Sequence, residues 1–366
     1  MPPPPLYAEM SVAAQTAFAN LEQAARQRDV ERSITDISGS FARKTVKNSV
    51  YWYYQTKDPD GRPQQAYLGP DSEFIQDLVA KRKSRTASAG DAHLARLSAA
   101  AIALGCVGIP PKHGRVIRRI AEYGFFRAGG VLAGTHAFLA FQNYLGATWR
   151  EAVTTMDLDF AHAGNNLSIA MPNQHPVDIR SAIESLQMGF LPVHGQARFK
   201  KADEPDFDVD FLTVLTRVGD EPIEVKSLGV SLQPLKFMEL AFERPVQTAL
   251  LLNDGPLVVN VPQPAYYALH KLIVHVERRR QNPSKSAKDL VQSGALIEYL
   301  LDHRPGELHD AYADVLSRGP GWKSRIEAGL GDLRKSMPAL QARERLAQSA
   351  PGKSLRARKP LPRTRG

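Results

Sequence analysis

The stretch VLAGTHAFLAFQNYLGATWREAVTTMDLDFA, from Val131 to Ala161, decides the fold predicted for this 366-residue chain. A short apolar run ends in Gly134 and Thr135, and a segment with helical composition, HAFLAFQNYL, follows it. Further on, MDLDF has the composition of a strand that carries Asp157 and Asp159 one residue apart. Because side chains alternate along a strand, both carboxylates are expected to project from the same face.

Two carboxylates on one face repel each other unless a cation lies between them. A hard divalent cation such as Mg²⁺ prefers oxygen ligands and is the natural partner. Asp-x-Asp spacing recurs elsewhere in the chain, so the context selects this pair: the apolar residues Met156, Leu158 and Phe160 flank the two acids. Two such ions, held by three carboxylates, can activate an attacking hydroxyl and stabilise a leaving pyrophosphate.

The residues on either side of this pair offer the rest of such a site. Gly134 permits a tight turn and the close approach of a phosphate, and Thr135 with the N–H groups of the helix start can receive the anion. Downstream, DFDVDFLTV provides a third carboxylate on another strand, either Asp208 or Asp210, which face the same side. For His136, which follows the turn, a packed or capping role is favoured over contact with a phosphate.

These pieces, in this order, resemble the DNA polymerase β-like nucleotidyltransferase fold. More closely, residues 111 to 302 are similar to bacterial nucleotidyltransferase-like proteins, which resemble abortive-infection and toxin-type (toxin–antitoxin) nucleotidyltransferases. The matching segments are GGVLAGTHAF, TTMDLDFA, VDFLT and VPQPAYYALHKLIVHVERRRQNPSKSAKDLVQ, about half of the chain. The turn departs mildly from the family, which often has Gly-Gly or Gly-Ser where this chain has Gly-Thr.

The resemblance implies a role for each matching residue. Gly134 and Thr135 would contact the triphosphate of an NTP such as ATP. Asp157, Asp159 and Asp210 would be the catalytic, metal-ligating carboxylates for two Mg²⁺ ions, with Mn²⁺ as an alternative; Asp210 is preferred over Asp208 because it lies in the VDFLT match.

A late basic–acidic motif completes the implied site. Lys271 and the Lys288–Asp289 pair match a motif that lies near the nucleotide in the toxin-type relatives. The alternatives are a solvated helix position for Lys271 and a first-turn charge pattern for Lys288 and Asp289. Arg127, Arg150 and Arg244 could also reach a triphosphate, but nothing in the sequence selects among them.

The expected function is a metal-dependent nucleotidyltransferase that moves an NMP from an NTP to an acceptor hydroxyl and releases pyrophosphate. The acceptor would be an RNA end, a protein side chain or a small molecule. One alternative is a catalytically inactive module of the same fold that binds nucleic acid. A sugar-nucleotide glycosyltransferase is disfavoured because the segment before Asp157 is mostly helical, without the parallel strands of a nucleotide-binding half.

Composition bounds the setting of this function. The net charge is +9, but the last sixteen residues hold six of the basic residues and no acid, so the charge is a weak indicator of a nucleic-acid groove. Cys106 is the only cysteine, which excludes a disulfide framework and a cysteine-based zinc site. The N-terminus lacks signal-peptide features and no apolar stretch is long enough to span a bilayer, so we expect a cytoplasmic protein without a membrane partner. The oligomeric state is left open.

The predicted fold class is α+β, with a nucleotidyltransferase (polymerase β-like) core built on a mixed β-sheet. An N-terminal helical and β-hairpin segment is expected over 1–92, the core over 93–262, a C-terminal helical region over 263–348 and a disordered basic tail over 349–366. The hairpin would pair the aromatic run Tyr51–Tyr54 with 65–68 across the turn at 58–61, and a linker is expected at 83–93. Its aromatic residues could stack on bases, although packing on a neighbouring helix is the favoured interpretation.

Overall fold

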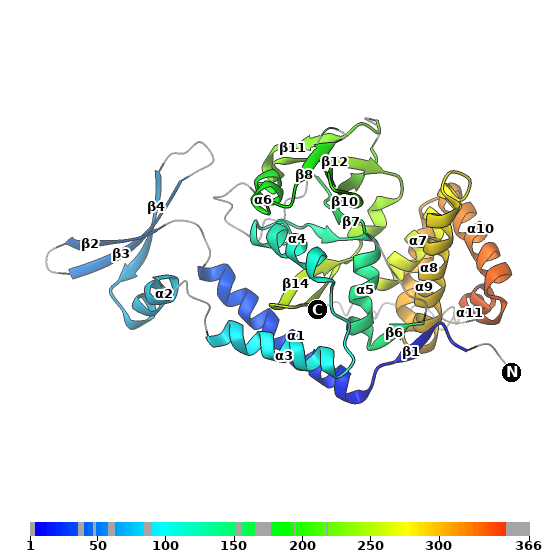
Figure 1. Ribbon diagram of the computed structural model, residues 1–366, viewed down its shortest axis with the longest axis horizontal. Coiled ribbons are helices and arrows are strands. Elements are labelled where there is room, and N and C mark those ends of the chain that lie inside the picture. The colour runs from blue at the N-terminus through cyan, green and yellow to red at the C-terminus, as the bar shows by residue number, and fades with distance from the viewer. Residues whose placement is uncertain are drawn as a thin grey trace, which may run out of the picture. The chain divides into compact units, whose positions relative to one another are not determined.

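The fold is seen in a computed structural model, which describes residues 4–35, 40–46, 49–57, 63–83, 89–150, 156–164, 177–193, 195, 197–216 and 219–348. The chain divides into two compact units. The first unit joins Met1–Leu6 to Pro264–Gly366, and the second is Tyr7–Gln263. Figure 1 shows the helices and strands of both units, and each unit is described by itself below.

A mixed sheet is the centre of the second unit, which confirms this part of the predicted fold class. Its central strand, β10, pairs in parallel with β7 and β12, whereas β5–β7, β9–β10, β8–β9 and β11–β12 are antiparallel. The strands of this sheet are β5 (Val131–Leu132), β7 (Leu158–Ala161), β8 (Phe190–Val193), β9 (Arg198–Lys201), β10 (Glu204–Val214), β11 (Ile223–Val225) and β12 (Val230–Leu235).

One face of this sheet is built from aromatic side chains. Phe160 of β7 and Phe211 of β10 stack with ring centroids 5.5 Å apart, and Phe125 makes edge contacts with both. Phe199 of β9 packs edge-on to Phe211. All of these rings are fully buried or nearly so, and burial of this much apolar surface fixes the register of the three strands. The aspartates, one residue out of step with the rings, must therefore project from the opposite face.

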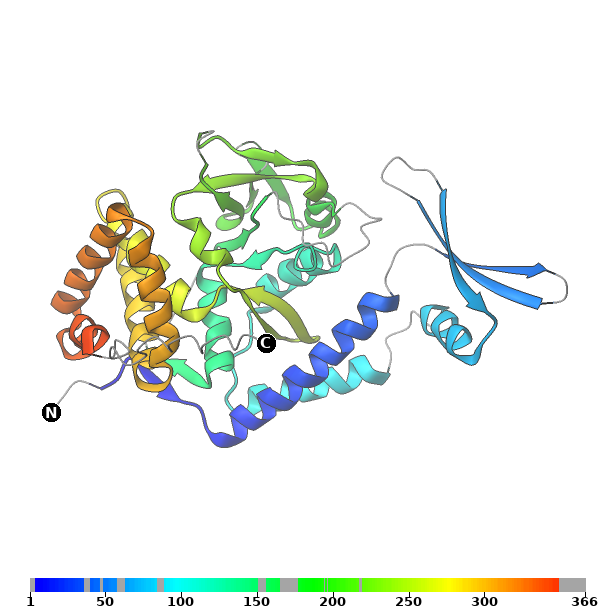
Figure 2. The ribbon, with the colours of Figure 1, turned by 180° about the vertical axis from the view of Figure 1, so that it is seen from behind.

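Helices and two smaller sheets complete the second unit around the mixed sheet. In Figures 1 and 2, α1 and α3 run side by side, and Phe18, Leu21, Leu94, Cys106 and Leu251 belong to the apolar cluster that joins them to β13. The remaining elements are α1 (Val12–Thr35), α3 (Ala89–Ala103), α4 (Pro111–Glu122), α5 (Gly134–Leu145), α6 (Ile179–Ser185), the 3-10 helices Lys226–Leu228 and Met238–Phe242, and the paired strands β1 (Tyr7–Glu9) with β6 (Ala147–Trp149) and β13 (Val246–Leu252) with β14 (Gly255–Val261).

The aromatic hairpin near the N-terminus is confirmed and has a third strand. The strands β2 (Ser40–Val46), β3 (Ser49–Lys57) and β4 (Pro63–Pro70) form an antiparallel sheet in that order, and α2 (Glu73–Lys83) follows it. The predicted turn at 58–61 lies outside the described residues. The predicted linker at 83–93 is wrong over its last part, because α3 already begins at Ala89; alanine favours a helix and the small residues here do not interrupt one.

The first unit is helical from Pro264 onward, as the sequence predicts. Each of its four longer helices begins at a proline, whose fixed φ and missing N–H suit the first helical position. The helices are α7 (Pro264–Arg278), α8 (Pro283–His303), α9 (Pro305–Ser317), α10 (Pro320–Ser336), the 3-10 helix Pro338–Leu340 and α11 (Ala342–Gln348). The predicted disordered tail, 349–366, lies outside the described residues. Among the described helices, none has the length and apolarity needed to cross a membrane.

Candidate active site

The turn between β5 and α5 is closed by Asp159. Gly134 has a φ of 55°, in the left-handed region, and a Cβ atom at this position would lie 1.9 Å from Oδ2 of Asp159. The N–H of Ala133 donates to the carbonyl oxygen of Asp159 at 2.8 Å. Glycine is therefore required here both by the backbone angle and by the carboxylate that lies against the turn. The start of α5 carries positive partial charge, which favours an anionic group at this place.

Asp159 and Asp210 are opposite each other on neighbouring parallel strands. The register pairs Asp159 of β7 with Asp210 of β10, and Leu158 with Val209. Paired strands lie about 4.8 Å apart, so the two carboxylates leave the sheet side by side. Asp208, two residues before Asp210 on β10, follows on the same face by alternation. Asp157 lies just before β7, which begins at Leu158 and not at the start of MDLDF as predicted, but its charge is near enough to act on Asp210. We call these four aspartates the acidic face.

Cations from β9 border the acidic face, and sequence analysis missed them. In the register, Arg198 is opposite Asp210 and Lys200 is opposite Asp208. Arg198 forms a two-pronged ion pair with Asp210: its Nη2 donates to Oδ2 at 2.9 Å, and its Nε contacts Oδ1. Asp208 Oδ2 lies 3.8 Å from Arg198 Nη1 and 3.7 Å from Lys200 Nζ.

The protonation of Asp210 is set by opposing influences. Burial raises the pKa of the Asp210 carboxyl above its ordinary value, the guanidinium of Arg198 lowers it, and the nearby charges of Asp208 and Asp157 raise it again. The hydrogen bond to Asp210 in turn raises the pKa of Arg198. Asp208 has a buried Oδ1 atom that accepts no hydrogen bond. A buried carboxylate oxygen without a donor is costly, and it is suited to receiving a cation.

Thr135 and His136 are both buried behind the turn. Thr135 is 6% exposed and His136 is fully buried. His136 Nε2 lies 2.9 Å from Nδ1 of His113 in α4, and the ring of His113 also lies against Phe207. Burial lowers the pKa of His113, and the charge of Lys112 lowers it further. The packed role favoured for His136 is therefore confirmed.

The late basic–acidic motif lies in the other compact unit. Lys271 Nζ is 2.7 Å from Oδ1 of Asp289, and Arg278 Nη1 is 3.2 Å from Oδ2 of the same carboxylate. The side chains of Asp289 and Lys271 are 3% and 12% exposed, so the solvated alternative for Lys271 is wrong. Lys288 is partly buried on the same helix as Asp289. Sequence analysis did not identify Arg278 as a partner of Asp289.

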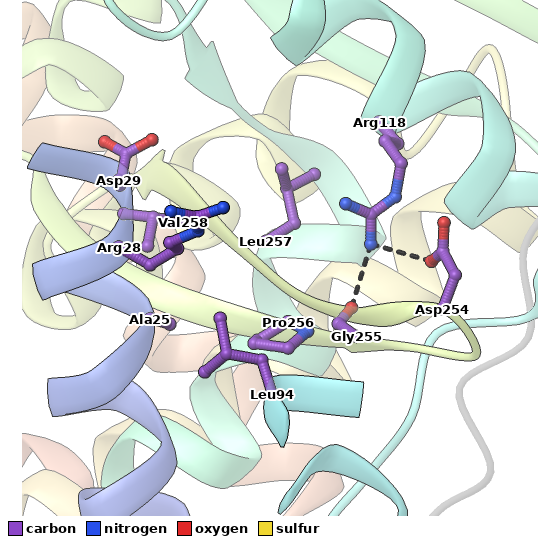
Figure 3. Close-up of a pocket in the computed structure, with 10 residues that line it drawn as sticks. All are labelled: Ala25, Arg28, Asp29, Leu94, Arg118, Asp254, Gly255, Pro256, Leu257 and Val258. Atoms are coloured by element: carbon purple, nitrogen blue, oxygen red, sulfur yellow. Dashed lines mark hydrogen bonds and ion pairs between the residues drawn. The ribbon is translucent and has the colours of Figure 1, made fainter. Parts of the chain in front are cut away.

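A separate cavity lies between α1, α3, α4 and β14 (Figure 3). Its volume is about 60 Å³, and a neighbouring cavity of about 340 Å³ shares Arg118 and Asp29 with it. Arg118 Nη2 donates to Asp254 at 2.7 Å and to the carbonyl oxygen of Gly255 at 2.9 Å. Arg127, one of the candidate triphosphate contacts, is bound to Asp29 at 3.4 Å in the larger cavity. Apart from Arg127, none of the predicted site residues lines these two cavities.

The acidic face has the ligand chemistry of a metal site, but its side chains are not arranged as one. Within the described ranges, no group of three or more His, Cys, Asp or Glu side chains is placed to hold a metal ion. The contact between Arg198 and Asp210 accounts for part of this arrangement, since it engages both oxygens of the third carboxylate. The two-metal site therefore stays a prediction.

Comparison with known proteins gives the family. Residues 111–317, more than half of the chain, match the family model described as Nucleotidyltransferase. The chain belongs to this nucleotidyltransferase family, which implies a transferase with a nucleotide substrate. The matched range includes every predicted site residue from Gly134 to Asp289.

Two further comparisons add little. The chain is similar to a solved structure, an antigenic nucleotidyltransferase-like protein from Paracoccidioides brasiliensis, with 14% identity and a TM-score of 0.25, over 58% of this chain and 92% of that one. A likeness at this score carries no argument about the fold or the site. A search of curated proteins found no match.

Proposed function

We propose that this protein transfers an NMP from an NTP to an acceptor hydroxyl on the acidic face, with release of pyrophosphate. The observation that carries the proposal is the pairing of Asp159 with Asp210 on adjacent parallel strands, with Gly134 against Asp159 at the start of α5. Carboxylates and a helix start thus lie together, and phosphoryl transfer needs both: oxygen ligands for cations and N–H donors for a phosphate. Family membership agrees with this chemistry.

The donor chemistry of the acidic face suits divalent cations such as Mg²⁺ or Mn²⁺. All four are hard oxygen donors, and Oδ1 of Asp208 is buried without a hydrogen-bond donor. Asp157, Asp159 and Asp210 would hold the ions, and Asp208 is a fourth candidate. When bound, such ions would lower the pKa of the acceptor hydroxyl and neutralise charge on the leaving pyrophosphate.

The remaining tasks fall to the protein's own groups. The N–H groups at Gly134 and Thr135 would orient the triphosphate at the positive end of α5. Arg198 and Lys200 offset the charge of four aspartates, which lowers the repulsion that an anionic substrate meets. In-line alignment of the acceptor with the α-phosphate then supplies much of the rate enhancement, because little covalent chemistry is asked of the chain.

The finer features of this proposal follow the family resemblance. They are a polymerase β-like core arrangement, a nucleotide contact from Lys271, Lys288 and Asp289, and kinship with abortive-infection and toxin-type enzymes. The acceptor would be an RNA end, a protein or a small molecule. Such kinship would give the transfer a role in defence or in a toxin–antitoxin pair.

The second candidate is an inactive module of this fold that binds nucleic acid. It is favoured by one observation: Arg198 occupies both oxygens of Asp210, as a permanent substitute for a cation would. Against it stands the grouping of four acids on one face, two of which, Asp208 and Asp210, are buried. Such a grouping lowers stability unless the face has a cationic ligand.

The test is transfer of label from each α-labelled NTP, with Mg²⁺, to mixed RNA and protein. We expect label in one class of acceptor, and a loss of at least about 10³-fold for Asp159→Asn, comparable to losses on removing a group that stabilises transition-state charge. Glu224→Gln, an exposed acid on β11 of the same sheet, should keep wild-type activity. Full activity in Asp159→Asn would refute the site, and no label in any acceptor would favour the inactive module.

A further inference from the structure

The small sheet β2–β3–β4 has two faces of different character. In the register, Tyr53 of β3 is opposite Tyr67 of β4, and Tyr51 is opposite Lys44 of β2. Because alternate residues share a face, these four side chains lie together. We call them the tyrosine face. Trp52, one residue out of step, belongs to the other face.

The face that carries Trp52 does the packing. Trp52 meets Phe41 edge-on at 6.5 Å, and its Nε1 donates to Asp71 at 2.7 Å just before α2. Gly69, the register partner of Trp52, lies close to Ile75 of α2, which is 6% exposed. Figure 1 shows α2 beside this sheet. The apolar anchoring of the sheet therefore uses Trp52 and its neighbours, and the tyrosine face is not needed for it.

The tyrosine face is open and its rings form a cluster. Tyr67 is 58% exposed and Lys44 is exposed. The ring centroid of Tyr67 lies 5.4 Å from that of Tyr53 and 6.2 Å from that of Tyr51, and Lys44 Nζ lies 4.6 Å above the ring of Tyr53. Tyr51 and Tyr53 are half-buried, so the cluster joins one exposed ring to two partly accessible ones. An aromatic cluster that reaches the surface in this way indicates a binding site.

The charge of the same strands points to an anionic partner. Between Ser40 and Lys57 the sequence has four basic residues, Arg43, Lys44, Lys47 and Lys57, and no acidic residue, and β4 carries no charge at all. The charge of Arg43 acts on Asp71, on the face that carries Trp52, whereas Lys44 lies beside the tyrosine rings. A face that combines aromatic rings with positive charge complements a chain of bases joined by phosphates.

We propose that the tyrosine face binds single-stranded nucleic acid. Bases would stack on Tyr51, Tyr53 and Tyr67, and Lys44 would contact a phosphate. A duplex hides its base faces and would lose the stacking contribution. This inference rests on the proposed function in one respect only: if transfer occurs, the bound strand is its acceptor.

The experiment measures fluorescence anisotropy of labelled 12-nucleotide strands, U₁₂ and dT₁₂, and of a 12-base-pair duplex with the full chain in EDTA at 150 mM salt. We expect the single strands to bind at least tenfold more tightly than the duplex. Tyr67→Ala should weaken single-strand binding about tenfold, and Tyr67→Phe should retain it, since the ring alone stacks. Lys44→Gln should lower the slope of log K against log[salt] by about 0.7, the value for one phosphate of a single strand.

Matched controls separate this site from other basic surfaces. The basic tail is present in every variant and contributes equally. Tyr123→Ala, a partly buried tyrosine at the end of α4, should bind as wild type. Wild-type binding in Tyr67→Ala, or duplex binding as tight as single-strand binding, overturns the inference.

A catalytic-site variant distinguishes this inference from the proposed function. Asp159→Asn should lose transfer and keep strand binding, because binding is measured without metal or NTP. Strand binding through the tyrosines without transfer to any acceptor would leave the inference standing and overturn the proposed function. Transfer to a protein or small molecule, with no binding of either single strand, would overturn the inference and leave the proposed function standing.

Discussion

At the scale of single residues, the candidate site depends on aspartates that share one face of the sheet, because alternate residues of a strand point to the same side. The sequence puts Asp157 with Asp159 and Asp208 with Asp210, but it does not say which strand neighbours which. The register supplies this: Asp210 is level with Asp159. The pairing of Arg198 with Asp210 could not be predicted, because the register of β9 on β10 shifts between Glu204 and Asp208. Such an irregularity cannot be recognised from the spacing of charges in the sequence.

Gly134 gives the sharpest prediction at this scale. Gly134→Ala places a Cβ where Asp159 Oδ2 now lies and holds an alanine at positive φ, so it should destabilise the fold by about 2–4 kcal/mol. Gly189→Ala is the control: it shares a positive φ, of 77°, but its Cβ would meet nothing within 4 Å, so only the backbone cost of about 1–2 kcal/mol remains. Urea unfolding measures both. Equal losses would show that Asp159 does not fill the turn.

Arg198 gives a second prediction, which concerns the binding of a cation. Arg198→Gln removes the guanidinium that engages both oxygens of Asp210, so Mn²⁺ should bind the acidic face several-fold more tightly than in the wild type. Electron paramagnetic resonance of free Mn²⁺ reports this without any assay of activity. Lys226→Gln, which removes an exposed charge from the same unit, should have little effect. Unchanged or weaker Mn²⁺ binding in Arg198→Gln would contradict competition between Arg198 and a cation.

At the scale of elements, alternation and length predict some strands and fail for others. β10 was predictable because apolar and acidic residues alternate in DFDVDFLTV, and the β3–β4 pair because aromatic residues flank a turn signal. β13 was missed since VQTALLL is a short apolar run, which does not distinguish a buried strand from a helix, and β12 was missed because its sequence contains Pro234. Pairing partners far apart in the chain come only from packing.

The end of β7 leads to a prediction about pH. His162 is fully buried, its Nε2 lies 2.8 Å from the carbonyl oxygen of Ala128, and its Nδ1 accepts from the N–H of Gly164 at 3.0 Å. These partners suit a neutral ring, with one nitrogen donating and the other accepting. Burial lowers the pKa of His162, and the hydrogen bond to Ala128 partly opposes this effect. Below the unfolded value of about 6.5, the unfolded chain therefore binds a proton that the folded chain does not. The stability that the neutral His162 contributes is therefore fully present above about pH 6.5. It is lost as the pH falls from the unfolded pKa towards the lowered folded pKa, at up to about 1.4 kcal/mol per pH unit.

Urea unfolding at pH 7.5 and 5.5 checks this sign. His162→Gln keeps a donor and an acceptor but does not titrate, so its loss of stability between the two values should be smaller than that of the wild type by up to about 1.4 kcal/mol. His113, whose pKa is also lowered by burial, is present in both proteins and cancels. His93→Gln, an exposed histidine of α3, should lose as much as the wild type. An equal loss in His162→Gln would mean that the histidine is not held neutral.

At the scale of the whole molecule, the predicted nucleotide contacts are divided between two compact units. Gly134, Thr135 and the acidic face belong to the unit 7–263, whereas Lys271, Lys288 and Asp289 belong to the helical unit. The family resemblance implies nucleotide contacts from both sets of residues. Each unit has its own internal support: the aromatic core in one, and in the other an ion-pair group of Lys271, Arg278 and Asp289. A ligand that binds only the folded chain stabilises it by mass action.

This gives a prediction for thermal unfolding of the full chain. An NTP with Mg²⁺ at one hundred times its Kd should stabilise the folded state by about 2.7 kcal/mol and raise Tm by several degrees, whereas either component alone should have a smaller effect. Lys271→Gln removes a partner of the buried Asp289, so its own Tm should be lower, and the increment produced by NTP with Mg²⁺ should shrink if Lys271 contacts the nucleotide. Arg325→Gln, which removes an exposed ion pair with Glu277 from the same unit, should keep the full increment. A full increment in Lys271→Gln would confine the nucleotide contacts to the unit that carries the acidic face.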